Sequence, residues 1–206
     1  MKRIAVMVSG GGTDLQSVIN GVKSGQIPGE IAVVIASKPG VYALERAKKA
    51  GIPSVVICKK DYADEQAFFD ANLSTLQSYK VEGVVLAGYL SILGKQMIEA
   101  FPNKIINIHP ALIPSFCGKG YYGLKVHEAA LKYGVKLSGA TVHFVDEGAD
   151  TGPIIAQRAV PVLPGDTPET LQRRVLIVEH EILPEAVALF CADRLKVEGR
   201  NVTILS

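Results

Sequence analysis

Residues 2–15, KRIAVMVSGGGTDL, join an apolar run of strand length to a glycine-rich turn that opens a helical pattern. Further apolar runs rich in valine and isoleucine lie at Ile31–Ala36, Ser54–Ile57 and Gly83–Ala87. Segments with apolar residues at helical spacing separate them, at Leu15–Val22, Ala43–Ala50 and Glu65–Tyr79. Runs with little polar alternation are typical of strands buried on both faces, as in a parallel sheet covered by helices. We therefore predict an α/β fold with an open, doubly wound, mostly parallel sheet flanked by helices.

The second half of the chain has a different pattern. Lys104–Ile108 is predicted to be a fifth strand, and Leu124–Tyr133 a helix closed by a glycine. Val135–Val145 and Ile154–Val162 are predicted to be longer strands. Because only a short loop, 146–153, joins them, an antiparallel pair is favoured, since a parallel crossover needs about a dozen residues or more.

A long helix is predicted to follow and to run to about Arg194. Pro168 is suited to its first position, with Thr167 or Asp166 as the N-cap. The chain contains no internal repeat or linker. We predict one domain over residues 1–206.

Composition excludes several classes of protein. The formal net charge of +2 and the absence of a Lys/Arg cluster argue against a nucleic-acid partner. No apolar run approaches the ~20 residues that span a membrane, and the first apolar run is too short for a signal peptide. Cys58, Cys117 and Cys191 lie far apart, which fits neither a disulfide framework nor a zinc site. We expect a cytoplasmic protein with no membrane partner and no metal.

The glycine-rich loop Ser9–Leu15 is the first candidate site. It lies at the carboxyl end of a strand, where open α/β sheets bind ligands. Glycines let the backbone approach an anion, and the amides at a helix N-terminus supply donors. The loop is not a Walker motif, and Leu15 stands where the dinucleotide fingerprint has its third glycine. An anion site is therefore favoured, and a tight turn without a ligand is the alternative.

A second candidate site combines Asn107, His109 and Asp150. Strand alternation places Asn107 and His109 on one face at a strand's carboxyl end, where they can converge on one small polar atom such as a carbonyl oxygen. Asp150 lies in a loop bounded by Gly148 and Gly152. A carboxylate near His109 would raise the pKa of the imidazole and orient it as a donor or proton carrier.

These segments together resemble the folate-dependent formyltransferase family over nearly the whole chain. The resemblance is carried, in order, by Ser9–Leu15, Gly83–Tyr89, Asn107–Pro114 and Gly139–Pro153. It implies transfer of a formyl group from 10-formyltetrahydrofolate, as co-substrate, to the primary amine of glycinamide ribonucleotide in purine biosynthesis. It also implies that the phosphate site lies in the N-terminal half of the domain and that the folate and catalytic sites lie mainly in residues 86–153.

The resemblance assigns roles to individual residues. Asn107 and His109 donate hydrogen bonds to the oxyanion of a tetrahedral intermediate, while Asp150 holds His109 and orders a water that passes protons. The residues implied to bind the ribonucleotide are Gly11, Gly12, Thr13, Asp14 and Glu179. Those implied to bind folate are Tyr89, Leu90, Ser91, Ile92, Leu93, Asn107, Ala140 and Asp146. The Ile113–Pro114 peptide bond is implied to be cis.

Four positions depart from the family's common pattern. Asp14 replaces an Asn, Ser91 an Arg beside the folate, Glu65 a phosphate-contacting Arg, and Leu176 a polar substrate contact. Asp14 could face the phosphate and repel it, or its side chain could cap the first helix. The segment Cys117–Gly123 is longer than in some relatives.

Two alternatives to the implied function stay open. The first is a formyltransferase that acts on a different amine. The second is a nucleotide-binding module without catalysis, which would have no use for the Asn107–His109 pair. The sequence does not predict the oligomeric state.

Overall fold

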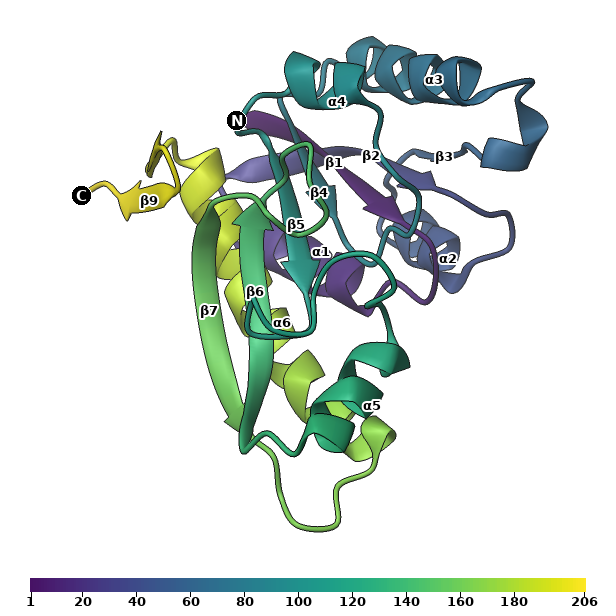
Figure 1. Cartoon of the computed structure of the whole chain (residues 1–206). Coiled ribbons are helices and arrows are strands. Elements are labelled where there is room, and N and C mark those ends of the chain that lie inside the picture. The colour runs from purple at the N-terminus through teal and green to yellow at the C-terminus, as the bar shows by residue number, and fades with distance from the viewer.

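The computed structural model describes all 206 residues and is built on one seven-stranded sheet (Figure 1). The strand order is β3-β2-β1-β4-β5-β6-β7. The strands are β1 Lys2–Val8, β2 Gly29–Ala36, β3 Ser54–Val56, β4 Gly83–Leu86, β5 Ile105–His109, β6 Leu137–Phe144 and β7 Ile154–Pro161. β1 to β5 pair in parallel, and β6 pairs antiparallel with both β5 and β7. The predicted sheet and the predicted antiparallel pair are confirmed.

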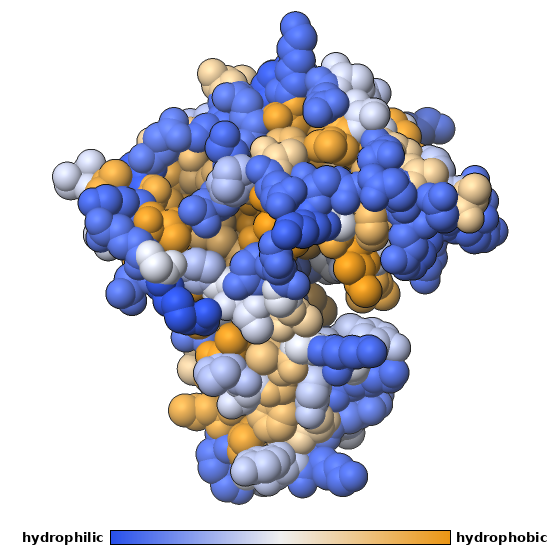
Figure 2. Space-filling view, turned by 45° about the horizontal axis from the view of Figure 1, so that its top comes forward, coloured by the Kyte–Doolittle hydropathy of each residue, from blue (hydrophilic) through white to orange (hydrophobic).

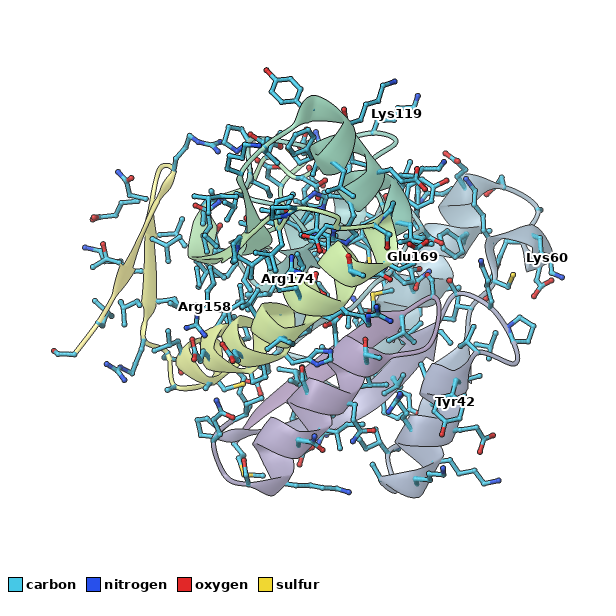
Figure 3. All side chains as sticks on the ribbon, turned by 90° about the horizontal axis from the view of Figure 1, so that it is seen from below. Tyr42, Lys60, Lys119, Arg158, Glu169 and Arg174 are labelled. Carbon is cyan, nitrogen blue, oxygen red and sulfur yellow. The ribbon has the colours of Figure 1, made fainter.

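Helices cover both faces of this sheet. They are α1 Thr13–Lys23, α2 Tyr42–Lys49, α3 Glu65–Ser78, α4 Lys95–Ala100, α5 Leu124–Tyr133 and α6 Pro168–Cys191, with a 3₁₀ turn at Lys59–Asp61. Alternation along β1 explains the two layers, because Val6 and Val8 face one core and Ala5 and Met7 face the other. The first core includes side chains of α1, α2, α5 and α6, and the second those of α3 and α4. Seen from below, α6 and α1 run side by side across the first layer, with α2 next to α1 (Figure 3).

The ends of α6 follow from its sequence. The Thr167 side chain accepts from the backbone N–H of Thr170, and the Thr170 side chain accepts from that of Thr167, so each hydroxyl satisfies an orphan helix amide. Thr167 is therefore the N-cap, as predicted, and Pro168 opens the helix. At the other end the helix stops at Cys191, earlier than expected, and Asp193 adopts a left-handed φ of 55°.

Three elements were not anticipated from the sequence. They are the 3₁₀ turn, the short helix α4, and a hairpin formed by β8 Leu195–Glu198 and β9 Asn201–Ile204. The hairpin lies beside the edge strand β7 (Figure 1). No helix combines the length and the apolar character that crossing a membrane requires. The Ile113–Pro114 bond is cis, as the resemblance implied.

Candidate active site between two cavities

The carboxyl end of β5 and the loop between β6 and β7 bring the predicted catalytic residues together. Asn107 and His109 lie two residues apart in β5 and point the same way. Asp150 comes from the β6–β7 loop. Its Oδ2 lies 3.6 Å from Nδ1 of His109, and its Oδ1 lies 3.5 Å from Nδ2 of Asn107.

Glycines in the β6–β7 loop set the position of Asp150. A Cβ at Gly152 would lie 1.8 Å from the carbonyl oxygen of Phe144, so only glycine lets the loop fold back this closely on β6. A Cβ at Gly148 would lie 2.0 Å from Oγ1 of Thr151. Asp150 itself adopts a left-handed φ of 58°, which aims its carboxylate at the end of β5.

His109 is almost completely buried, with 4% of its surface exposed. Its Nε2–H donates to the carbonyl oxygen of Phe116 at 2.9 Å, which leaves Nδ1 facing Asp150. Burial lowers the pKa of His109 below its ordinary value, although the charge of Asp150 acts in the opposite direction. Asp150 does raise this pKa, as expected, but the loss of solvent outweighs the carboxylate and the net shift is downward. Since Nε2–H is committed to a carbonyl, His109 can donate to a substrate only from a protonated Nδ1.

Asp150 is held in its charged form. Burial raises its pKa, but His143, the N–H of Gly118 and His109 together lower it below the ordinary value. The Gly118 N–H donates to Oδ2 at 2.8 Å. Phe116 and Gly118 both come from the irregular segment after β5, so this segment holds both members of the His109–Asp150 pair.

His143, for which the sequence predicts no role, lies in the same cluster. His143 is buried in β6, and its Nε2 lies 3.1 Å from Nδ2 of Asn107 and 3.6 Å from Oδ1 of Asp150. Its Nδ1 lies 2.8 Å from the carbonyl oxygen of Phe144 and donates to it, so Nε2 is the ring nitrogen that faces Asn107 and Asp150. Strand pairing was the signal that could have found it, because His143 lies directly opposite Asn107 in the β5–β6 register.

Two cavities meet at this cluster. The first, of about 360 Å³, is lined by Leu86, Tyr89, Leu90, Ser91, Ile92, Leu93, Ile98, Asn107, His143, Val145, Asp146, Glu147, Gly148, Ala149 and Asp150. The second, of about 250 Å³, is lined by Asp14, Gly88, Tyr89, Leu90, Asn107, Ile108, His109, Pro110, Tyr121, Tyr122, Gly123, Asp150, Gln172, Leu176 and Glu179. They share Tyr89, Leu90, Asn107 and Asp150. A group in one cavity can therefore reach a group in the other across Asn107 and Asp150.

The first cavity contains all but one of the residues predicted to bind folate. The exception is Ala140, which lies within β6, is fully buried, and belongs to the core under α1 and α6. Ala140 thus lies inside a strand, where alternation turns its side chain away from the cavity. Leu90 and Ile92 are 57% and 80% exposed, unusual for apolar residues of this size. Figure 2 shows such apolar patches among charged and polar side chains on one face of the molecule.

The second cavity contains two of the residues predicted to bind the ribonucleotide, Asp14 and Glu179. Burial raises the pKa of Glu179 well above its ordinary value, and the nearby charge of Asp14 raises it further. Burial also raises the pKa of Asp14, while His180, whose Nε2 lies 3.6 Å from Oδ1 of Asp14, lowers it. Gly12 is the N-cap of α1 and no side chain caps this helix, so the alternative in which Asp14 caps it is wrong.

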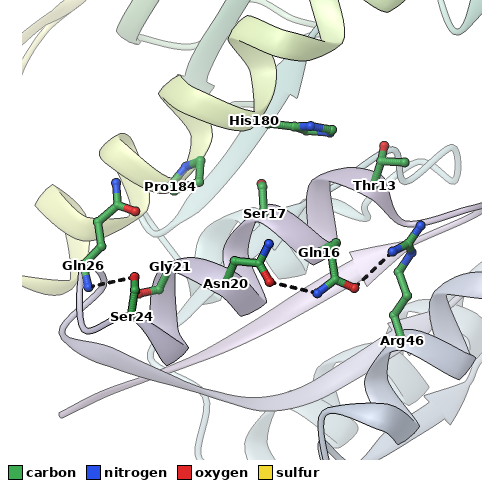
Figure 4. Close-up of a pocket in the computed structure, with 10 residues that line it drawn as sticks. All are labelled: Thr13, Gln16, Ser17, Asn20, Gly21, Ser24, Gln26, Arg46, His180 and Pro184. Atoms are coloured by element: carbon green, nitrogen blue, oxygen red, sulfur yellow. Dashed lines mark hydrogen bonds between the residues drawn. The ribbon is translucent and has the colours of Figure 1, made fainter.

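Gly11, Gly12 and Thr13 form the loop that leads into α1, next to this second cavity. Thr13 lines a third cavity of about 510 Å³ that runs between α1 and α6 and includes Arg46 and His180 (Figure 4). Glu65 lies at the first turn of α3, where it pairs with Lys59. Glu65 therefore cannot replace the phosphate-contacting arginine that is common at this position in the family.

No cluster of three or more His, Cys, Asp or Glu side chains has the arrangement of a metal site. The cysteines are all unpaired.

Comparison with known proteins places this geometry in a family. The model of the formyl transferase family matches residues 2–187, and the chain therefore belongs to that family. Its relatives include the phosphoribosylglycinamide formyltransferase of Haemophilus influenzae, 41% identical over 96% of this chain and 91% of the relative. The chloroplastic enzyme of the same name from Arabidopsis thaliana is 42% identical over 99% of this chain and 70% of the relative.

Solved structures and longer relatives agree with this assignment. The glycinamide ribonucleotide transformylase 1 of Symbiobacterium toebii superposes with a TM-score of 0.95 at 49% identity, covering 100% of this chain and 95% of that one. The trifunctional purine biosynthetic protein adenosine-3 of Drosophila pseudoobscura is 44% identical over 95% of this chain, which spans only 14% of that protein. The predicted fold, family and formyltransferase class are confirmed.

Proposed function

We propose that the chain transfers the formyl group of 10-formyltetrahydrofolate to the primary amine of glycinamide ribonucleotide, which makes it a phosphoribosylglycinamide formyltransferase of purine biosynthesis. One observation carries the proposal in this molecule: Asn107 and Asp150 lie in the wall shared by a cavity rich in apolar side chains and a cavity with buried carboxylates. The first suits a pterin ring, and the second a hydroxyl-rich ribonucleotide. Residues 1–206 form one formyltransferase domain in this proposal.

The chemistry follows from what these side chains can donate and hold. The amine nitrogen attacks the formyl carbon, and the carbonyl oxygen becomes the oxyanion of a tetrahedral intermediate. Nδ2 of Asn107 and protonated Nδ1 of His109 donate to that oxyanion, in an enclosed site where such donors act strongly. As the bond to folate N10 breaks, a proton passes from the amine nitrogen to N10 through a water ordered by Asp150. The products are formylated ribonucleotide and tetrahydrofolate, and the sequence of steps uses no metal.

Asp150 and His109 depend on each other in this mechanism. The carboxylate is charged and lies 3.6 Å from Nδ1, so it stabilises the imidazolium at the moment when the oxyanion forms. Burial keeps the imidazolium scarce in the empty site. The donor is therefore strongest when both the carboxylate and the developing oxyanion are present. This satisfies the requirement that a catalyst interact more strongly with the transition state than with the substrate.

The binding contacts we propose follow the two cavities. The segment Tyr89–Leu93 and Asp146 hold the folate, and Asp14 and Glu179 contact the ribonucleotide, whose phosphate lies on the backbone of Gly11–Thr13. The compartment we propose is the cytoplasm, because the three unpaired cysteines suit a reducing environment.

One assay tests the function directly. The protein is mixed with 10-formyltetrahydrofolate and glycinamide ribonucleotide, and tetrahydrofolate formation is followed by absorbance. Reactions without the ribonucleotide, or with glycinamide in its place, are the controls. Turnover that needs the ribonucleotide supports the proposal. Folate deformylation at the same rate without any amine, or faster turnover with another amine, would refute it.

A further inference from the structure

Helix α2 contacts the glycine loop at two consecutive peptide groups. The backbone N–H of Ala43 donates to the carbonyl oxygen of Gly10 at 3.3 Å, and Nε of Arg46 donates to that of Gly11 at 2.8 Å. The next carbonyl, of Gly12, accepts from the N–H of Gln16 at 3.0 Å and begins α1. Three successive carbonyl groups are thus fixed by α2 and α1.

Fixing the carbonyls also fixes the amides. In a trans peptide the C=O and the following N–H point in opposite directions. Because the carbonyls of Gly10 and Gly11 point toward α2, the N–H groups of Gly11 and Gly12 point away from it, side by side. Neither N–H donates to an acceptor in the chain. The N–H of Thr13 points out of the N-terminus of α1, so three adjacent amides can converge on one anion.

Space around the loop agrees with this orientation. A Cβ placed on Gly10 or Gly11 would meet nothing within 4 Å, so a ligand can approach the backbone there. A Cβ on Gly12 would lie 2.7 Å from Cβ of Ala43, so Gly12 lets the loop rest against α2. One side of the loop is therefore open and the other is in close contact with α2.

Arg46 is itself held firmly. Its Nη1 donates to Oε1 of Gln16 at 3.0 Å, and Nε2 of Gln16 donates to Oδ1 of Asn20 at 3.0 Å (Figure 4). Its guanidinium also lies over the ring of Tyr42, 5.0 Å from the centroid. Nη2 has no partner in the chain, and the group shares a cavity with Thr13 and His180. A charged group thus stands beside the loop with one nitrogen free.

We propose that Arg46 is a positioning residue for the ribonucleotide phosphate: it holds the glycine loop with its amides turned toward the ligand. The inference rests on the function proposed above. A loop fixed in this way can bind the phosphate dianion of the ribonucleotide through its backbone amides, although the chain has Asp14 at the loop and Glu65 in place of an arginine. The guanidinium fork suits this positioning role, since a lysine ammonium cannot reach Gly11 and Gln16 in the same fixed geometry.

Arg46→Met tests the proposal, with Lys48→Met as the matched control. Lys48 is an exposed cation on the same helix that makes no side-chain contact with the loop. We expect Arg46→Met to raise the KM for the ribonucleotide at least tenfold and to change kcat and the folate KM less than threefold. Lys48→Met leaves all three constants at wild-type values. A ribonucleotide KM within threefold of wild type in Arg46→Met overturns the proposal, as does an equal change in both KM values.

A second variant and a second readout separate this inference from the proposed function. Arg46→Lys keeps the charge and most of the volume, and we expect a ribonucleotide KM between those of wild type and Arg46→Met; a wild-type KM overturns the positioning role. Inorganic phosphate is the probe that needs no catalysis. It should shift the amide NMR signals of Gly11 and Gly12 in the wild-type protein, with at least tenfold weaker binding in Arg46→Lys. This result can hold even if the enzyme acts on another amine, whereas equal phosphate binding by both proteins refutes the inference alone.

Discussion

Replacing Asp14 with asparagine removes a negative charge from the wall of the second cavity and keeps the shape of the side chain. Asp14 does not cap α1, so the substitution removes no helix cap. Because Asp14 lies at the loop that we propose binds the phosphate, we expect Asp14→Asn to lower the KM for the ribonucleotide.

The size of the effect on KM can be estimated from the Coulomb energy between Asp14 and a neighbouring phosphate charge. Two unit charges ~4 Å apart repel by about 1 kcal/mol in water and by about 4 kcal/mol at an effective dielectric constant of 20. His180 offsets part of this repulsion whenever its ring carries a proton, because its Nε2 lies 3.6 Å from Oδ1 of Asp14. A net repulsion of about 1 kcal/mol corresponds to a roughly fivefold lower KM. Burial raises the pKa of Asp14, so the advantage of asparagine should grow as pH rises and Asp14 loses its proton.

The assay is initial-rate kinetics at several salt concentrations and pH values. At low salt Asp14→Asn should have the lower KM, and the gain should shrink as salt is added. His180→Gln should raise the KM in the wild-type background, because Asp14 loses its counter-charge, and should have no effect in Asp14→Asn. A KM that is unchanged or higher in Asp14→Asn at low salt refutes the electrostatic reasoning. Equal effects of His180→Gln in both backgrounds refute the pairing with Asp14.

Three further results are expected. His109→Ala and Asp150→Asn should each reduce turnover by a factor on the order of a hundred to a thousand, while ribonucleotide binding, measured by calorimetry, stays close to wild type. A variant that keeps more than about a tenth of wild-type turnover contradicts the role assigned to its residue. Glu179→Gln should raise Tm, with no gain near pH 4 and a growing gain at higher pH, because the raised pKa of Glu179 makes the folded wild-type protein lose stability as pH rises from the unfolded pKa toward the folded pKa. Thermal unfolding between pH 4 and 8 checks this prediction, and a gain in Tm that does not depend on pH argues against it. Gly12→Ala should lower Tm by about 2–4 °C for each kcal/mol of strain, because the new Cβ would lie 2.7 Å from Cβ of Ala43 and the backbone φ of Gly12 is 71°. Gly10→Ala meets no neighbouring atom and should leave Tm near wild type, so similar Tm values for the two variants would show that an alanine at Gly12 is not strained.

The parallel sheet could be predicted because its central strands are buried on both faces. Lys2–Val8 and Gly83–Leu86 carry apolar residues at consecutive positions, and in a chain of alternating strands and helices this leaves a parallel sheet as the simplest solution. The hairpin of β8 and β9 was missed because its strands have four residues each and pair only with each other. Such short elements depend on tertiary contacts that local sequence does not record.

The convergence of Asn107, His109 and Asp150 could be predicted because each of them has a local signature. Alternation places Asn107 and His109 on one face, and glycines bracket Asp150. His143 was missed because its role depends on strand register, which spacing along the chain does not reveal. The net direction of the pKa shift at His109 could not be predicted for a related reason. It depends on how much solvent is removed, and a sequence shows the neighbouring charge but not the depth of burial.

The left-handed backbone at Asp150 limits which mutations this enzyme could have explored. Glycine, asparagine and aspartate adopt that conformation readily, whereas β-branched and bulky residues are strained by it. The asparagine codons and two of the glycine codons each differ from an aspartate codon at one base, so drift at this site moves first from aspartate to asparagine or to glycine. Two of these retain the loop and lose the carboxylate. Under the role proposed for Asp150, a well-folded descendant that has lost formyl transfer is therefore one base substitution away.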